Sequence, residues 1–364
     1  MNVVAGIEDI RVGAYRVPTE QPESDGTLSW DSTTLVLAEI MAGGVTGIGY
    51  TYAARSAAVL INDLFAPLLQ GHDAFAIPAR WDAMVHAVRN LGRPGIASTA
   101  ISAVDTALWD WKAKYLRMPL STLLGKAHDS VLAYGSGGFT SFTQPQLDHQ
   151  LHDWAAQGLL AVKMKVGREP QCDAQRVASA RAAIGPQISL FVDANGAYSR
   201  KQALDLAQCF AQSGVTWFEE PVSADDLPGL RLLRDRAPAG MNISAGEYAW
   251  STDDFRRLLE HQAVDVLQAD ATRCGGITGF LMAAALCESF HVPLSSHCAP
   301  SLHVPVMCCV RPAVHVEYFV DHVRLENLLF DGSPAVQAGR LAPDPARPGL
   351  GIEFKAGEAA CYRL

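Results

Sequence analysis

Polar, mostly ionisable side chains end seven consecutive apolar segments between residues 159 and 319. They are Lys163 and Lys165, Asp193 and Asn195, Glu219 and Glu220, Glu247, Asp270, His297 and Glu317. Each segment is short and rich in Val, Leu and Ile, as expected of a buried strand. One such residue is commonly a solvated loop side chain or a helix cap. Seven in succession indicate a functional cluster at the carboxyl ends of parallel strands.

Three carboxylates in this set predict a metal site. Asp193, Glu219 and Glu247 end consecutive strands, so their side chains can converge on one point. Carboxylates without Cys or His form a hard oxygen site, which favours Mg²⁺ over Zn²⁺. Asn195 and Glu220 are expected to contact substrate or to support the ligands. Glu220 follows Glu219 directly and would point to the opposite face of an ideal strand.

The two lysines predict a base on one flank of this metal site. Lys163 and Lys165 alternate in "LAVKMKVG", so both ammonium groups project to the same side of the strand. Their mutual repulsion and a nearby divalent cation would lower both pKa values. Lys165, closer to the strand end, is the predicted base. Lys163 is expected to keep that pKa low and to contact a substrate carboxylate oxygen.

An Asp–His pair is predicted on the opposite flank. His297 lies two strands after the last metal ligand, and Asp270 ends the strand between them. Asp270 can accept the proton of one imidazole nitrogen, which fixes the tautomer and leaves the other nitrogen facing the centre. The sequence therefore predicts an acid or base on each side of a metal-bound carboxylate.

The segments that position these residues predict a barrel. From about residue 130 to 320, eight strands alternate with helices, which is typical of a parallel (β/α) barrel. A doubly wound open sheet is the alternative, but no GxGxxG motif follows the first strand.

The segments outside this region have a different pattern. Residues 32–42 predict a strand after a flexible polar stretch at 19–31, and residues 93–118 predict a long helix. The stripe of that helix is Ile96, Ala100, Val104, Leu108 and Trp111. Residues 120–128 are predicted to be a connector. The tail after residue 331 is expected to fold back onto the N-terminal region.

Composition excludes several classes of partner. The 364 residues carry a net charge of −9, which disfavours nucleic acid and anionic membranes. Charges within the first residues leave no signal-peptide core, and no stretch of 18 apolar residues predicts a membrane span. The eight cysteines include no CxxC pair and lie mostly in apolar segments. They are therefore expected to be reduced thiols of a cytoplasmic protein.

The motifs KxK, VDxN, WxEEP, GE, "QAD" and "SSH" together resemble the enolase superfamily, and within it the mandelate racemase subgroup. The resemblance implies a modified (β/α)₇β TIM barrel at residues 126–325 and an α+β capping domain at 1–125, completed by the tail at 326–364. It also implies a homo-oligomer. The implied roles are Asp193, Glu219 and Glu247 as Mg²⁺ ligands, Lys165 and His297 as paired bases, Lys163 and Asp270 as their helpers, and Glu317 as an acid bonded to the substrate carboxylate; Lys163, Asn195 and Glu317 would bind substrate.

The reaction implied is removal of the proton alpha to a carboxylate, with Mg²⁺ stabilising the enolate. Dehydration of an aldonate or aldarate to a 2-keto-3-deoxy acid is favoured, because Tyr52, Arg55 and Arg273 suit a polyol. Racemisation or epimerisation of an α-hydroxy acid, lactone cycloisomerisation and a non-catalytic sugar-acid binding protein are alternatives. The muconate cycloisomerase and dipeptide epimerase pattern would place lysine where this chain has Asp270. The segments 19–31 and 47–56 do not identify a substrate.

Overall fold

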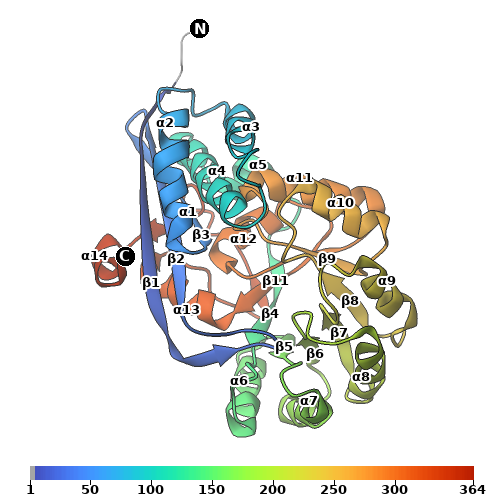
Figure 1. Cartoon of the computed structure of the whole chain (residues 1–364). Helices are drawn as coiled ribbons and strands as arrows, with labels where there is room; N and C mark the ends of the chain where they lie inside the picture. Colours follow the sequence, from blue (N-terminus) through green and yellow to red (C-terminus); the bar gives the residue numbers. More distant parts are fainter. Residues whose placement is uncertain (1–4) are drawn as a thin grey trace.

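The structure, a computed structural model, describes residues 5–364. Its first part is an antiparallel sheet covered by helices, which forms a cap on the barrel (Figure 1). The strands are β1 (Ile7–Ser24), β2 (Ser29–Ala42) and β3 (Val45–Tyr52). The helices are α1 (Arg55–Leu60), η1 (Ile61–Phe65), α2 (Ala66–Leu69), α3 (Ile77–Ala87), α4 (Ile96–Tyr115) and α5 (Leu120–Leu124).

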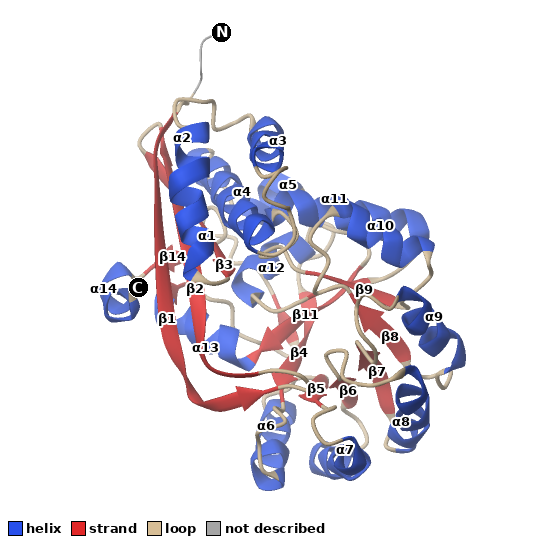
Figure 2. Ribbon diagram, in the orientation of Figure 1, coloured by secondary structure: helices blue, strands red, loops and turns tan. Residues whose placement is uncertain are grey.

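Eight parallel strands form the predicted barrel, and β4 pairs with β11 to close it. They are β4 (Val131–Gly137), β5 (Ala161–Lys165), β6 (Ser189–Asp193), β7 (Val215–Glu219), β8 (Asn242–Ala245), β9 (Val266–Ala269), β10 (Leu294–Ser296) and β11 (Ala313–Phe319). Figure 2 shows helices around the outside of this sheet. Closure of the sheet excludes the doubly wound alternative.

A helix follows each barrel strand. These are α6 (Gln144–Ala156), α7 (Pro170–Ile184), α8 (Arg200–Gln212), α9 (Leu227–Arg236), α10 (Thr252–Glu260), α11 (Gly276–Phe290), α12 (Pro300–Met307) and α13 (Val320–Leu329). The last of them, α13, contacts β4 and β11 and continues across residue 325. The division of the chain at residues 125 and 325 stays a prediction.

The stretch 19–31 is not the flexible segment that its polar composition predicted. Most of it belongs to β1 and β2, which pair as a long hairpin that bends at a register shift between Pro18 and Glu23. Figure 1 shows this hairpin reaching from the cap to the strand ends near β5 and β6. Cross-strand pairing and contacts with the barrel order residues that look solvated in the sequence.

The predicted long helix is α4, and it begins at Ile96 rather than at residue 93. Ala100, Val104, Leu108 and Trp111 are fully buried as the stripe predicted, but Ile96 is 48% exposed at the first turn. The predicted connector contains the short helix α5.

The C-terminal tail folds back as expected, and it contacts both parts of the molecule. Strand β12 (Phe330–Asp331) pairs with β14 (Glu353–Phe354), and β13 (Arg340–Leu341) extends the barrel sheet beside β4. The helices α14 (Ala356–Ala359) and η2 (Ala360–Tyr362) end the chain. The backbone N–H of Leu364 donates to Ala14 of β1, which ties the terminus to the cap.

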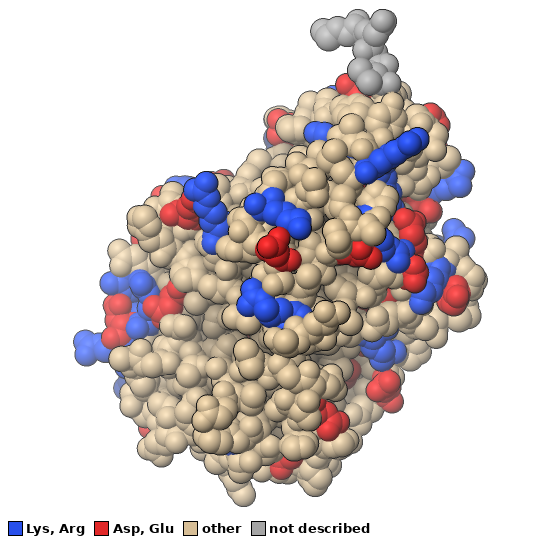
Figure 3. All heavy atoms as spheres, turned by 180° about the vertical axis from the view of Figure 1, so that it is seen from behind, with Lys and Arg blue, Asp and Glu red and all other residues tan. Residues whose placement is uncertain are grey.

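The surface carries charges of both signs. On the face shown in Figure 3, Lys and Arg side chains lie beside Asp and Glu side chains rather than in one continuous basic patch. Among residues 5–364, no helix combines the length and apolar character needed to cross a bilayer. Each of the eight cysteines is free of a disulfide.

Candidate active site

The three predicted metal ligands lie together at the carboxyl ends of neighbouring strands. Asp193 of β6 is paired in register with Glu219 of β7, and Glu247 follows β8. One oxygen from each carboxylate lies within 4.8 Å of the other two, and all three side chains are buried. Gly246 lets the chain turn here: its φ is +138°, and a Cβ atom would lie 2.0 Å from the carbonyl oxygen of Gln268.

This cluster fits a hard divalent cation. Burial and the charge of Asp193 raise the pKa of Glu219 to about 7, although Lys163 opposes the shift. Three buried acids this close repel one another, and such a site is stabilised by an ion with oxygen ligands. Asp193, Glu219 and Glu247 would hold Mg²⁺, which when bound stabilises negative charge developing on a substrate carboxylate.

Both lysines reach these carboxylates. Lys163 Nζ lies 2.7 Å from both oxygens of Glu219 and 2.8 Å from Glu317 Oε1. Lys165 Nζ donates to Asp193 Oδ2 at 2.5 Å. The predicted placement of both ammonium groups on one side of β5 is therefore observed.

The net direction of the lysine pKa shifts differs from the sequence expectation. Burial is the largest effect on the pKa of Lys165 and lowers it, as does Lys163, but Asp193 and Glu247 outweigh them and raise it. Burial likewise lowers the pKa of Lys163, but Glu219 and Glu317 outweigh this effect, and the net shift is upward. The expectation considered only repulsion between cations, whereas carboxylates on neighbouring strands contribute more here.

Glu220 and Asn195 occupy a turned backbone beside the acids. Both have positive φ, 38° and 46°, because the chain leaves its strand at these positions. Glu220 is buried, and burial followed by the charges of Glu247 and Asp193 raises its pKa well above the usual range. Alternation along an ideal strand predicted that Glu220 points to the opposite face. Its carboxylate instead stays beside the other acids, because the backbone turns at this position. Asn195 lies at the cavity, and its N–H donates to Asp193 Oδ1 at 2.9 Å.

The predicted Asp–His pair is present on the other side of the barrel mouth. His297 Nδ1 lies 2.8 Å from Asp270 Oδ2, and Nε2 lies 3.1 Å from Glu247 Oε2. Thr272 N–H donates to Asp270 Oδ1 at 2.7 Å and fixes that carboxylate. Burial lowers the pKa of His297, but Cys298, Glu247 and the hydrogen bond to Asp270 outweigh this effect, and the net shift is upward. An imidazole held in this way can donate or accept a proton through Nε2.

Glu317 joins the two flanks. Its Oε1 accepts a hydrogen bond from Ser136 Oγ at 2.6 Å in addition to the Lys163 contact. Its Oε2 accepts the N–H of Cys298 at 2.8 Å. Burial raises its pKa, but Lys163 and His297 outweigh this effect and lower it below the usual value.

Lys165, Glu247, His297 and Glu317 line one cavity of about 440 Å³ between barrel and cap. The tip of the β1–β2 hairpin closes one side of it. A Cβ atom on Gly26 would lie 2.6 Å from the carbonyl oxygen of Ala194, so this tip approaches the barrel loops as closely as only glycine permits. The cap therefore forms part of the cavity wall.

Two of the three polyol candidates line the cavity. Tyr52 and Arg273 do so, and the Arg273 guanidinium lies 3.4 Å from Glu247 Oε1 and 3.5 Å from Asp270 Oδ2. Arg55 is exposed on α1 and does not line the cavity. Alternation along a strand could not show that the chain turns into a helix at this point.

The cavity residues that were not singled out from the sequence include Cys298, Tyr248 and His322. Cys298 Sγ lies 3.3 Å from His297 Nε2, in a backbone with φ of 52°. His322 belongs to α13, beyond the last strand end, so the strand-end pattern does not include it. Tyr248 directly follows the predicted metal ligand Glu247, and this adjacency was the one feature of the sequence that could have placed it at the site.

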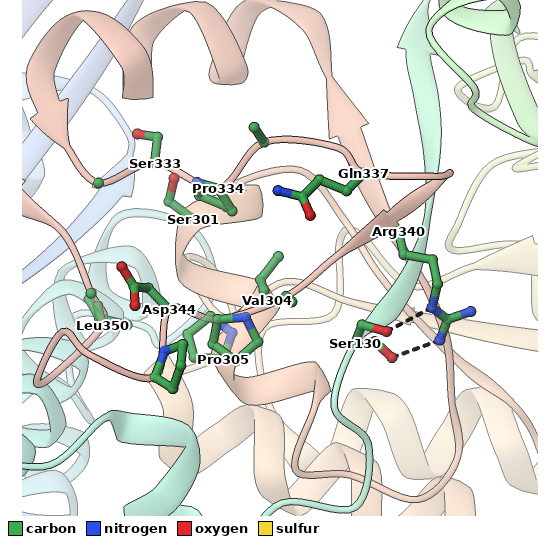
Figure 4. A pocket seen from close by; sticks show the side chains of 16 residues that line it. Ser130, Ser301, Val304, Pro305, Ser333, Pro334, Gln337, Arg340, Asp344 and Leu350 are labelled. Atoms are coloured by element: carbon green, nitrogen blue, oxygen red, sulfur yellow. Dashed lines mark hydrogen bonds between the residues drawn. The ribbon is translucent and has the colours of Figure 1, made fainter.

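A second cavity, of about 560 Å³, lies between α12 and the C-terminal tail (Figure 4). The Arg340 guanidinium donates to Oγ and to the carbonyl oxygen of Ser130 at 2.7 and 2.8 Å, and so is engaged at the edge of this cavity. None of the strand-end residues lines it, whereas five of them line the smaller cavity: Lys165, Asn195, Glu247, His297 and Glu317.

Comparison with known proteins agrees with this geometry. Residues 9–125 match the family "mandelate racemase / muconate lactonizing enzyme, N-terminal domain", and residues 146–359 match the family "enolase C-terminal domain-like". The 3,6-anhydro-alpha-L-galactonate cycloisomerase of Streptomyces coelicolor is 33% identical over 80% of this chain and 82% of its own. The L-talarate/galactarate dehydratase of Salmonella typhimurium is 31% identical over 92% and 86%.

Solved structures share the whole fold. A mandelate racemase/muconate lactonizing enzyme-like protein from Rubrobacter xylanophilus is 51% identical, covers 99% of this chain and 100% of its own, and has a TM-score of 0.96. A racemase from Streptomyces coelicolor with bound magnesium is 30% identical over 98% and 100%, with a TM-score of 0.93. The chain belongs to the mandelate racemase/muconate lactonizing enzyme family of the enolase superfamily, whose members are Mg²⁺-dependent dehydratases, cycloisomerases and racemases.

Proposed function

We propose that this enzyme dehydrates a sugar acid to a 2-keto-3-deoxy acid. The observation that carries the proposal is the placement of Lys165 and the His297–Asp270 pair on opposite sides of one cavity. Two barrel strands separate β5 from β10 in one direction and four in the other. The carboxylates of Asp193, Glu219 and Glu247 lie between them.

Each residue has a defined part in this reaction. Lys165 Nζ takes the proton alpha to the carboxylate, and Lys163 contacts a carboxylate oxygen that gains charge. Neutral Lys165 is required. Asp193 would be engaged by the Mg²⁺ held at the three carboxylates, which would weaken the contact that favours the ammonium form of Lys165. His297 Nε2 then gives its proton to the departing β-hydroxyl, which leaves as water. The resulting enol tautomerises to the keto acid.

Supporting residues keep these groups in place. Asp270 orients His297, and Glu317 and Asn195 are proposed to contact the substrate carboxylate and a neighbouring hydroxyl. Relatives named as talarate/galactarate, arabinonate and rhamnonate dehydratases favour this outcome for the present chain.

Cycloisomerisation of a sugar lactone is the second candidate. Two relatives, 33% and 30% identical, are named cycloisomerases, and one of them acts on an anhydro sugar acid. Racemisation or epimerisation would use the same two flanks without loss of water. A pure sugar-acid binder would not need them.

Cytoplasmic location, self-association, and the division of the chain at residues 125 and 325 also stay proposals.

The deciding experiment is a screen of aldonic, aldaric and lactone substrates with Mg²⁺ in D₂O. Formation of a 2-keto acid supports dehydration. An isomerised lactone without loss of water would establish the cycloisomerase instead. Loss of optical rotation without a keto product would establish a racemase, and absence of alpha-carbon deuterium exchange in a bound acid would indicate a binder.

A further inference from the structure

The cavity wall is charged on its barrel side. Lys165, Glu247, Arg273, His297 and Glu317 line that side. Both cations are already engaged by carboxylates, because Lys165 contacts Asp193 and Arg273 contacts Glu247. Among the residues that line this cavity, Lys and Arg occur only on the barrel side, so a substrate carboxylate can meet a cation only there.

The cap side has a different composition. Nine cavity residues come from the segment 25–54, and none of them is Lys or Arg. Ser32, Thr33 and Thr34 of β2 supply hydroxyl groups, and Trp30 supplies an aromatic face. The one ionisable carboxyl of this segment at the cavity is Asp25.

His322 adds a neutral donor to this side. Its Nδ1 accepts the backbone N–H of Ala299 at 3.3 Å, which requires a lone pair on Nδ1 and leaves the proton on Nε2. Within residues 5–364, Nε2 has no hydrogen-bond partner. Burial and the charge of His297 lower the pKa of His322 to about 3, in agreement with a neutral ring.

The orientation of this imidazole is fixed by packing. Its ring stacks on Tyr52 with centroids 3.4 Å apart and lies edge-on to Phe319 at 5.0 Å. Tyr52 in turn donates its hydroxyl to the buried Glu326 at 3.3 Å, where Tyr50 also donates at 2.7 Å. His322 is thus held against the cavity by a chain of contacts that reaches into α13.

From this wall we infer that the enzyme selects monocarboxylic sugar acids with an uncharged, hydroxylated distal end, and that His322 Nε2–H donates to a distal hydroxyl. The inference rests on the proposed function and narrows its substrate class to aldonates. A second carboxylate at the distal end would face Asp25 without a cation, and burial of an unpaired charge is costly. A distal hydroxyl can instead both donate to and accept from the groups of this wall.

The first test compares each hexonate with the hexarate of the same configuration, since the pair differs only at C6. The hexonate should have a kcat/KM higher by at least about tenfold, because a buried unpaired charge costs more than a buried hydroxyl. Equal values, or a preference for hexarates, would overturn the inference while leaving the dehydratase intact. If no acid undergoes alpha-proton exchange or dehydration, the proposed function itself fails.

Two substitutions make the test specific to this wall. Thr34→Lys supplies the missing cation and should raise kcat/KM for hexarates relative to hexonates by about tenfold. The uncharged Thr34→Met should not change that ratio. An unchanged ratio in a folded Thr34→Lys would show that charge on this side does not govern selection.

His322 is tested by comparing long and short substrates. His322→Phe should lower kcat/KM for the hexonate by about tenfold, the expected loss of one hydrogen bond in a buried site. Alpha-proton exchange in glycerate, which has no distal hydroxyl, should keep its wild-type rate. His261→Gln, at an exposed histidine at the end of α10, is the control. An equal loss for both substrates would mean that His322 supports the fold rather than reads the hydroxyl.

Discussion

The barrel side and the cap side of the cavity are built by different means. On the barrel side, buried strand ends place acids and lysines in direct contact, such as Lys163 with Glu219 at 2.7 Å. On the cap side, a hairpin and a loop present hydroxyls and aromatic rings without a cation. The backbone ladder fixes the first set, since Lys165, Asp193 and Glu219 lie in register on three neighbouring strands.

This difference assigns separate tasks to the two sides. Groups that must act on the same atoms need positions fixed to a fraction of an ångström, which paired strands provide. Groups that select a substrate can lie on loops whose sequence varies without loss of the fold. Substitutions on the barrel side should therefore abolish chemistry, and those on the cap side should change selectivity or KM.

Removal of the metal should have the largest effect. With excess EDTA, activity should fall to background, and Mg²⁺ should raise the Tm by relieving repulsion among Asp193, Glu219 and Glu247. Glu219→Gln should weaken Mg²⁺ binding, measured by calorimetry, and leave far-UV circular dichroism unchanged. Full activity in EDTA would contradict the metal site.

Loss of Lys165 should be the next most severe change. Lys165→Ala should lower both alpha-proton exchange and net turnover by about 10²–10⁴-fold, because a positioned base contributes this much. Exchange is followed by proton NMR in D₂O, with Lys126→Ala, at a partly exposed lysine, as the control. Wild-type exchange in the Lys165 variant would transfer the role of base to His297.

Substitution of His297 should separate two steps that Lys165→Ala removes together. His297→Asn should lose dehydration by about 10²–10⁴-fold because no acid remains to protonate the leaving hydroxyl. Alpha-proton exchange on the Lys165 face should persist in the same samples. If exchange and dehydration fell equally, His297 would be the base or would be needed for binding.

The barrel side could be predicted from the sequence because strand alternation and strand order place Lys165, Asp193 and Glu219 in one register. Its pKa directions could not, since they depend on which carboxylates surround each lysine after folding. The cap side was less predictable. The hairpin tip is ordered by contacts with residues far along the chain: the N–H of Thr140, for example, donates to the carbonyl oxygen of Ser24. Arg55 lies outside the cavity because helix α1 begins at this residue.

On the cap side, a single methyl group at the hairpin tip should alter KM more than the fold. Gly26→Ala places a Cβ atom 2.6 Å from Ala194 O and 2.7 Å from Val166 O, so the tip must move away from the barrel. We expect kcat/KM to fall by about tenfold through misplacement of the substrate. Gly240→Ala, where a Cβ atom meets nothing within 4 Å, is the matched control. Equal kinetics for the two variants would show that the tip does not shape the cavity.

The smallest expected effect is on stability and should leave activity unchanged. It concerns the seam between the two sides, which is the contact of helix α4 of the cap with helix α11 of the barrel. Asp105 of α4 accepts hydrogen bonds from the N–H and hydroxyl of Thr278 on α11, at 2.9 and 2.6 Å. Burial nevertheless raises the pKa of Asp105 to about 7. Between about pH 4 and pH 7 the folded state binds this proton more tightly than the unfolded state, so stability falls as the pH rises.

Asp105→Asn cannot ionise and should escape that loss. Its Tm relative to the wild type should therefore increase from pH 4 to pH 7, whatever constant change the altered hydrogen bonds cause. Thermal unfolding at pH steps of one unit measures this difference, with the fully exposed Asp129→Asn as the control. A Tm difference that stays constant with pH would mean that Asp105 keeps its charge in the seam, sustained by the two bonds from Thr278 against the cost of burial.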